Sequence, residues 1–92
     1  KHALAGFTKQ LALDYAEAGI QIFGIAPGAV KTKMTAADFE PGGLADWVAE
    51  ETPIKRWLDP QEIANVSLFL ASGKAAAMQG EIIKIDGGWS LK

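Results

Sequence analysis

The fold of this chain is decided by Gly19-Ile20-Gln21-Ile22-Phe23-Gly24-Ile25-Ala26-Pro27-Gly28, a short apolar run between two glycine signals. The run is rich in Ile and too short for a helix, which suits a strand buried on both faces of a parallel sheet. We therefore expect a strand over residues 20–26 that Pro27 and Gly28 end.

Helical patterns flank the expected strand on both sides. Apolar residues recur at helical spacing over residues 2–18, and Gly19 is well placed to end that helix in the left-handed conformation. On the other side, Asp59 is a good N-cap and forms a capping-box-like pattern with Glu62. We therefore expect a second helix over residues 60–71.

The remaining stretches predict a lobe and a last strand. Residues 35–57 are the least regular part, and we interpret them as a lobe of short helices. Residues 81–85 predict a final strand before Asp86-Gly87-Gly88. The order helix, strand, lobe, helix, strand is typical of a parallel α/β architecture. Ligands bind at the carboxyl ends of the strands in such sheets, so the loop 27–34 is the expected site.

The composition argues against several classes of protein. The 92 residues contain no cysteine and one histidine, so we expect neither a disulfide framework nor a metal site. A formal net charge of −2 gives no basic surface for nucleic acid. No run approaches the roughly 20 apolar residues of a membrane-spanning helix. We expect a cytoplasmic protein that binds neither nucleic acid nor a membrane.

Three blocks of the sequence carry a resemblance to a known family. The run from Lys1 to Lys9 looks like the small-residue helix that follows a Tyr-x-x-x-Lys pair, and residues 27–32 read Pro-Gly-x-x-x-Thr after the expected strand. The third block comprises Asp59-Pro60-Gln61-Glu62-Ile63-Ala64, Phe69-Leu70-Ala71-Ser72, Gln79-Gly80 and Asp86-Gly87-Gly88. Together the blocks resemble the classical short-chain dehydrogenases/reductases, with the 3-oxoacyl-acyl-carrier-protein reductases as the closest branch.

The resemblance implies a domain organisation. Residues 1–92 would be the C-terminal fragment of a single dinucleotide-binding domain, with 35–57 as its substrate lobe. The fold class would be α/β, the C-terminal part of a doubly wound parallel-sheet Rossmann-type domain, because both halves of such a sheet would not fit in this length. The catalytic tyrosine and the glycine-rich phosphate loop are then expected before Lys1, and the chain by itself is expected to be inactive.

The implied chemistry is hydride transfer between NADP or NAD and a carbonyl or alcohol. Lys1 is the implied catalytic lysine, because its ammonium would lower the pKa of a tyrosine hydroxyl from about 10 and would bind the nicotinamide ribose. Pro27, Gly28, Val30 and Thr32 are the other implied cofactor contacts, with glycine letting the backbone approach a flat ring. Taken alone, Lys1 favours a solvated lysine, and Pro27-Gly28 favours an ordinary strand-ending turn with Thr32 as a helix N-cap. Together with the flanking blocks, both favour the functional interpretation.

The resemblance also implies a substrate class and an assembly. The substrate would be a small carbonyl compound or an acyl thioester, as in fatty acid biosynthesis, and the protein would be a homo-oligomer, a tetramer. The alternatives are a sugar or polyol dehydrogenase of the same family, or a non-catalytic oligomerisation or binding module. The large apolar residues of the lobe fit either a lid over the substrate or the lobe's own core; they are Met34, Leu44, Trp47 and Trp57.

Overall fold

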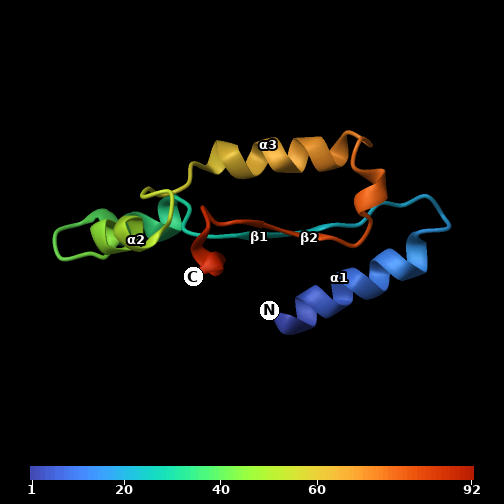
Figure 1. The fold of residues 1–92 in the computed structure, drawn as a ribbon, viewed down its shortest axis with the longest axis horizontal. Helices are drawn as coiled ribbons and strands as arrows, with labels where there is room; N and C mark the ends of the chain where they lie inside the picture. Colours follow the sequence, from blue (N-terminus) through green and yellow to red (C-terminus); the bar gives the residue numbers. More distant parts are fainter. The chain divides into compact units, whose positions relative to one another are not determined.

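The computed structural model describes residues 1–92 and shows two compact units. The first unit comprises residues 1–26 and 65–83, and the second comprises 27–64 and 84–92. The single-domain interpretation stays a prediction. Along the chain (Figure 1) the elements are α1 (His2–Tyr15), β1 (Gly24–Pro27), the 3-10 helix η1 (Lys33–Phe39), α2 (Ala45–Glu51), α3 (Pro60–Ala71), the 3-10 helix η2 (Ala76–Met78), β2 (Ile82–Ile85) and the 3-10 helix η3 (Trp89–Leu91).

The strands β1 and β2 pair in a two-stranded sheet. The N–H of Gly24 donates to the carbonyl of Glu81 at 3.0 Å, and the N–H of Gly28 donates to the carbonyl of Ile85 at 2.9 Å. The residue numbers rise along both strands from the first bond to the second, so the strands run parallel. The predicted parallel α/β arrangement is confirmed.

The first strand begins later than the expected residue 20, because a side chain takes the hydrogen bonds of the earlier residues. The side-chain oxygen of Gln79 accepts from the N–H of Ile22 at 3.0 Å, and its nitrogen donates to the carbonyl of Ile20 at 3.0 Å. The strand starts only at Gly24. The predicted strand over 20–26 is therefore wrong for residues 20–23.

The first helix ends three residues before the predicted residue 18, and Gly19 has the predicted left-handed conformation. Regular α-helix stops at Tyr15, and the chain then closes with two further bonds, from the N–H of Gly19 to the carbonyl of Ala16 at 3.1 Å and from Ile20 to Tyr15 at 3.3 Å. Gly19 has a φ of 77°. This bond pattern around a left-handed glycine is a Schellman motif, so the expected role of Gly19 as the residue after the helix is confirmed.

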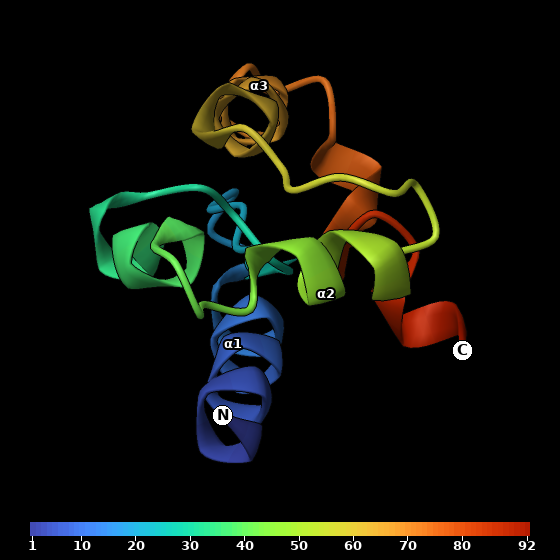
Figure 2. The same ribbon diagram turned by 90° about the vertical axis from the view of Figure 1, so that its left-hand side faces the viewer.

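The second unit packs around Leu58, which is 3 % exposed, and Thr52, which is 2 % exposed. The ring of Trp57 lies 4.8 Å from that of Phe39, centroid to centroid, and its indole N–H donates to the carbonyl of Ala45 at 2.9 Å. The stretch contains two short helices, η1 and α2 (Figure 2), as predicted, and its role as a substrate lobe stays a prediction. Trp57 is half-buried and packs within this stretch.

The helix α3 begins where the sequence predicts. The carboxylate of Asp59 accepts from the N–H of Gln61 at 2.8 Å, and the carboxylate of Glu62 accepts from the N–H of Asp59 at 2.9 Å. The guanidinium of Arg56 also forms a bidentate ion pair with the carboxylate of Glu62, with N–O distances of 2.7 and 3.0 Å. Hydrogen bonding from Arg56 is the main cause that lowers the pKa of Glu62 to about 2. The predicted capping box is confirmed.

None of the helices combines the length and the apolar character that crossing a membrane requires.

Candidate functional site

The loop 27–34 leaves the carboxyl end of β1, where the sequence predicts a site. Pro27 is the last residue of the strand and is exposed. Gly28 and Val30 are half-buried, and Thr32 is exposed at the start of η1. The second unit therefore brings all four predicted loop residues together on one short segment.

Gly28 packs against the end of β2. A Cβ atom at Gly28 would lie 2.7 Å from the Cα of Asp86 and 2.8 Å from its Cβ, which is closer than real atoms approach. A glycine is therefore required here by the packing of the two strand ends. This reason was not apparent from the sequence, and a close approach of a cofactor ring to Gly28 stays a prediction.

Val30 forms an isolated parallel bridge with Leu58. The carbonyl of Ala29 accepts from the N–H of Leu58 at 2.8 Å, and the N–H of Lys31 donates to the carbonyl of Leu58 at 3.0 Å. In such a bridge the peptide groups on either side of the central residue face the partner strand, and the residue's own N–H and C=O face away. The N–H of Val30 therefore points to the side opposite Leu58.

Thr35 organises this loop and was missed by the sequence reasoning. Its hydroxyl donates to the carbonyl of Val30 at 3.0 Å and accepts from the N–H of Thr32 at 2.9 Å. Thr32 is the N-cap residue of η1, with an extended backbone at φ −135° and ψ 178°. The spacing of Thr32 and Thr35 is that of a capping box, and this signal was available in the sequence. The N-cap interpretation of Thr32 is confirmed, and its cofactor contact stays a prediction.

Asp86 places a fixed negative charge beside Gly28. Its carboxylate accepts from the N–H groups of Gly88 at 3.0 Å and Ser90 at 3.2 Å. A hydrogen bond from the Ser90 side chain is the main cause that lowers the pKa of Asp86. Asp86 is therefore ionised near neutral pH and holds the turn that leads into η3.

Lys1 belongs to the first unit, whereas the four loop residues belong to the second. It is exposed at the start of α1, and its carbonyl accepts from the N–H of Ala5 at 3.0 Å. Its proposed action on a tyrosine stays a prediction.

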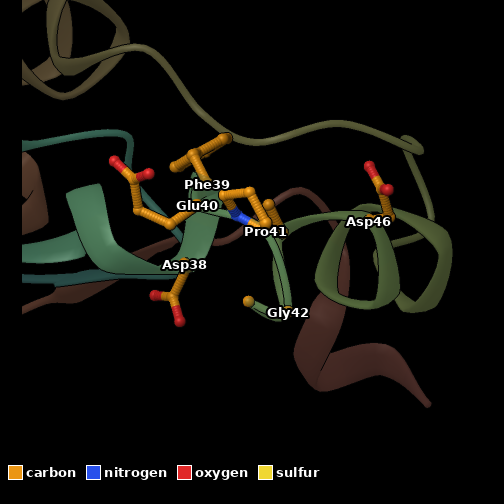
Figure 3. A pocket seen from close by; sticks show the side chains of 8 residues that line it. Asp38, Phe39, Glu40, Pro41, Gly42 and Asp46 are labelled. Atoms are coloured by element: carbon orange, nitrogen blue, oxygen red, sulfur yellow. The ribbon is translucent and has the colours of Figure 1, made fainter.

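The lobe carries an open hollow of about 350 Å³. It is lined by Asp38, Phe39, Glu40, Pro41, Gly42, Gly43, Ala45 and Asp46. Figure 3 shows the carboxylates of Asp38, Glu40 and Asp46 pointing in different directions. No group of three or more His, Cys, Asp or Glu side chains is arranged to hold a metal ion.

Comparisons with known proteins bear on this site. The family described as enoyl-(acyl carrier protein) reductase matches residues 1–90. The chain is 38% identical over 88 residues to the 5-keto-D-gluconate 5-reductase of Escherichia coli (strain K12), covering 96% of this chain and 35% of that protein. It thus spans about a third of the length of the curated relatives it matches.

Two solved structures share the fold. A gluconate 5-dehydrogenase from Burkholderia cenocepacia J2315, in complex with NADP and tartrate, matches with a TM-score of 0.91 at 33% identity, covering 100% of this chain and 36% of that one. A 3-oxoacyl-acyl-carrier-protein reductase from Brucella melitensis, in complex with NAD, matches with a TM-score of 0.87 at 34% identity, covering 97% and 35%. These likenesses confirm the predicted α/β fold class, part of a doubly wound Rossmann-type sheet.

Proposed function

The chain belongs to the short-chain dehydrogenase/reductase family, and we propose that the complete protein is an NAD(P)-dependent oxidoreductase that interconverts a carbonyl compound and an alcohol. The observation that carries the proposal is the loop 27–34 at the carboxyl end of β1, where open α/β sheets bind their ligands. Because the chain spans only part of its relatives, the remaining cofactor contacts lie in the rest of the complete protein.

The loop fits the nicotinamide end of NADP or NAD. The N–H of Val30 faces away from Leu58 and is placed to donate to a carboxamide, while Thr32 offers an exposed hydroxyl. Pro27 and Gly28 fix the path of the backbone between these groups and the strand. When bound, the nicotinamide ring supplies or accepts the hydride. The relatives solved with NADP and with NAD support both cofactors as candidates.

Lys1 is the proposed partner of a tyrosine that provides or accepts the proton. An ammonium one helical turn from a phenol stabilises the tyrosinate, which brings a pKa of about 10 closer to neutrality. Its exposed position at the start of α1 leaves the side chain available for this role. In the complete protein, Lys1→Met should remove most activity and shift the pH dependence of alcohol oxidation upward. Wild-type pH dependence in a folded Lys1→Met variant would exclude Lys1 from the mechanism.

A 3-oxoacyl thioester is the proposed substrate. Large apolar side chains of the lobe are available to an acyl chain, with Met34 96%, Leu44 57% and Trp47 55% exposed. A sugar acid is the second candidate, because the gluconate enzymes are among the relatives. NADPH and NADH oxidation by the complete protein with acetoacetyl-CoA and with 5-keto-D-gluconate decides between them, and no oxidation with either refutes both.

The hydroxyl of Thr32 gives a direct test of the cofactor contact. Thr32→Val keeps the branched shape and removes one hydrogen-bonding group, so dinucleotide affinity should fall by about 0.5–1.5 kcal/mol. Thr32→Ser keeps the hydroxyl and serves as the matched control. Calorimetry with NADPH and NADH measures both, and an unchanged affinity of Thr32→Val places Thr32 outside the site.

We also propose that the complete protein is a cytoplasmic homotetramer. Exposed apolar side chains on α1, with Leu4 69% and Phe7 60% exposed, support packing of this helix against further protein. Sedimentation equilibrium of the complete protein tests the tetramer.

A further inference from the structure

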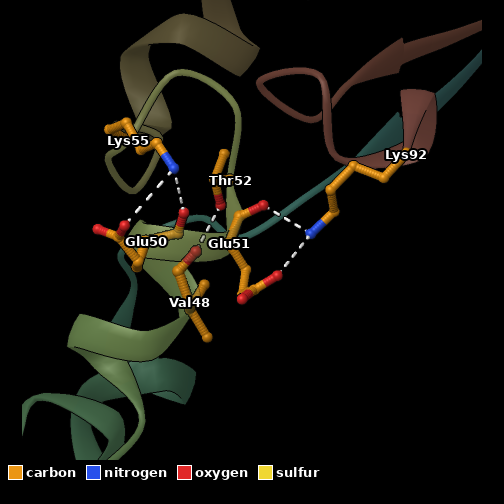
Figure 4. A network of polar contacts seen from close by, with 6 residues as sticks. All are labelled: Val48, Glu50, Glu51, Thr52, Lys55 and Lys92. Atoms are coloured by element: carbon orange, nitrogen blue, oxygen red, sulfur yellow. Dashed lines mark hydrogen bonds and ion pairs between the residues drawn. The ribbon is translucent and has the colours of Figure 1, made fainter.

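The C-terminal end of α2 is capped by side chains from outside the helix. The last carbonyls of a helix have no partner within it and need donors from elsewhere. The hydroxyl of Thr52 donates to the carbonyl of Val48 at 2.6 Å, and the ammonium of Lys55 donates to the carbonyl of Glu50 at 2.6 Å. The ammonium of Lys92 donates to the carbonyl of Glu51, also at 2.6 Å. Figure 4 shows the two ammonium groups reaching the same helix end from different segments.

Two of these caps are cations, which a helix C-terminus favours because its carbonyls carry partial negative charge. With only seven residues, α2 is too short to be stable by its own backbone bonds. The capping lysines therefore contribute to the order of this helix as well as to its placement.

Lys55 adopts a backbone conformation that lysine disfavours. Its φ of 61° is the one positive value among the non-glycine residues. A glycine would adopt this conformation without strain. The lysine instead provides an ammonium that reaches the carbonyl of Glu50 and lies 3.8 Å from that residue's carboxylate.

Lys92 connects α2 to a segment 41 residues away in the sequence. Its ammonium also lies 3.2 Å from the carboxylate of Glu51 and 4.0 Å from the centre of the Trp89 ring. Trp89 in turn lies edge-on to Trp47 of α2, at 6.2 Å between ring centroids. The segment 89–92 thus contacts α2 through an ion pair, a hydrogen bond from the Lys92 ammonium to a backbone carbonyl, and an aromatic contact.

The backbone at Gly87 and Gly88, which precede this contact, packs closely against the segment that follows α2. A Cβ at Gly87 would lie 2.8 Å from Ile54 Cγ1, and one at Gly88 would lie 3.0 Å from Pro53 Cβ. The N–H of Ile54 donates to the carbonyl of Gly87 at 3.3 Å. Residues 87–88 therefore have little room to shift along the segment that follows α2.

We propose that Lys92 is a positioning residue that fixes α2, and with it the substrate lobe, in the orientation that binds the carbonyl substrate. The inference rests on the proposed oxidoreductase function for its kinetic consequence, and on the contacts of Lys92 for its structural one. Lys55 assists from the opposite side of the same helix end.

The test uses three variants of the complete protein at Lys92 and Lys74, and a Lys55→Met variant is added for the hydrogen-exchange measurement. Lys92→Met removes the ammonium and keeps an unbranched stem, Lys92→Arg keeps the positive charge, and Lys74→Met is the matched control at an exposed lysine of the first unit. Lys92→Met should speed the hydrogen exchange of the amides of residues 48–52 by about five- to tenfold. Lys92→Arg and Lys74→Met should exchange close to wild type.

The kinetic arm separates positioning from general stability. With acetoacetyl-CoA or 5-keto-D-gluconate as substrate, Lys92→Met should raise KM about three- to tenfold and leave the affinity for NADPH unchanged. Lys92→Arg should restore most of the wild-type KM. An unchanged KM in an active Lys92→Met variant overturns the positioning role, whether or not exchange is faster.

Failure of the proposed function gives a different result. If wild-type protein neither binds dinucleotide nor oxidises it with either substrate, the oxidoreductase proposal fails. The hydrogen-exchange arm still tests the cap, because it requires no turnover. Wild-type exchange at residues 48–52 in both Lys92→Met and a Lys55→Met variant shows that the lysines do not hold α2 and overturns the inference.

Discussion

The start of α3 and the end of α2 are both capped by charged side chains, but the caps come from different distances along the chain. Every group that caps the start of α3 lies within six residues, from Arg56 to Glu62. At the end of α2, one ammonium comes from Lys92, 41 residues from its partner Glu51. The cap of α3 was predicted from the sequence because its residues are near neighbours, whereas the cap from Lys92 requires the fold.

The largest effect is expected where distant segments meet most closely. Gly28→Ala places a Cβ against the backbone of Asp86, 58 positions along, and the strand ends must separate. We expect a loss of about 1–3 kcal/mol in the free energy of unfolding, as for other overpacked sites. Urea unfolding of the complete protein measures it.

Gly6→Ala is the control for this prediction, because nothing lies within 4 Å of a Cβ at Gly6 in the middle of α1. Alanine is the better helix former there, by about 0.5–1 kcal/mol, so this variant should be slightly more stable than wild type. Equal effects of the two substitutions would show that the distant contact at Gly28 carries no special cost.

The same contrast explains how much of the fold the sequence predicts. The bounds of α3 were predicted correctly, because Asp59, Pro60 and Glu62 are neighbours whose roles depend only on spacing. The strand β1 was placed too early, because Gln79, 57 residues beyond Ile22, takes the backbone bonds of its expected first half. No local sequence pattern predicts that the side chain of Gln79 takes these backbone hydrogen bonds.

The candidate site likewise has features that were predicted from the sequence and features that were missed. The loop 27–34 was placed correctly at the carboxyl end of β1, since that follows from the strand and the Pro-Gly turn. The reason for Gly28 was missed, because it depends on Asp86 at the end of the other strand. Thr35 was missed although its spacing from Thr32 was available in the sequence, because the N3 residue of a capping box is usually Glu or Gln and not Thr.

A smaller effect is expected from a purely local cap. Asp59→Ala removes the carboxylate that accepts from the N–H of Gln61, and it should cost about 0.5–2 kcal/mol of unfolding free energy. Asp59→Asn keeps an oxygen in the same position and should retain most of that stability. If the asparagine variant loses as much as the alanine variant, the hydrogen bond is not what Asp59 contributes.

The smallest effect, and the sharpest test of the local cap, is its pH dependence. Glu62 has a folded-state pKa of about 2, lowered mainly by hydrogen bonding from Arg56, against an ordinary value of 4.5. A lowered folded pKa means that the carboxylate stabilises the folded state, and that this contribution is complete above the ordinary pKa. It is lost as pH falls from about 4.5 toward about 2. Because both side chains are exposed to water and salt, the effect is small.

Glu62→Gln measures this contribution directly. The amide cannot ionise, so the stability difference between wild type and Glu62→Gln should be constant above pH 4.5 and should shrink as pH falls toward 2. Arg56→Met in the wild-type background should reduce the same slope, because it removes the main cause of the lowered pKa. Urea midpoints at several pH values measure both variants. A difference that stays constant from pH 6 to pH 2 would mean that Arg56 and Glu62 do not pair in solution, and the start of α3 would then rest on Asp59 alone.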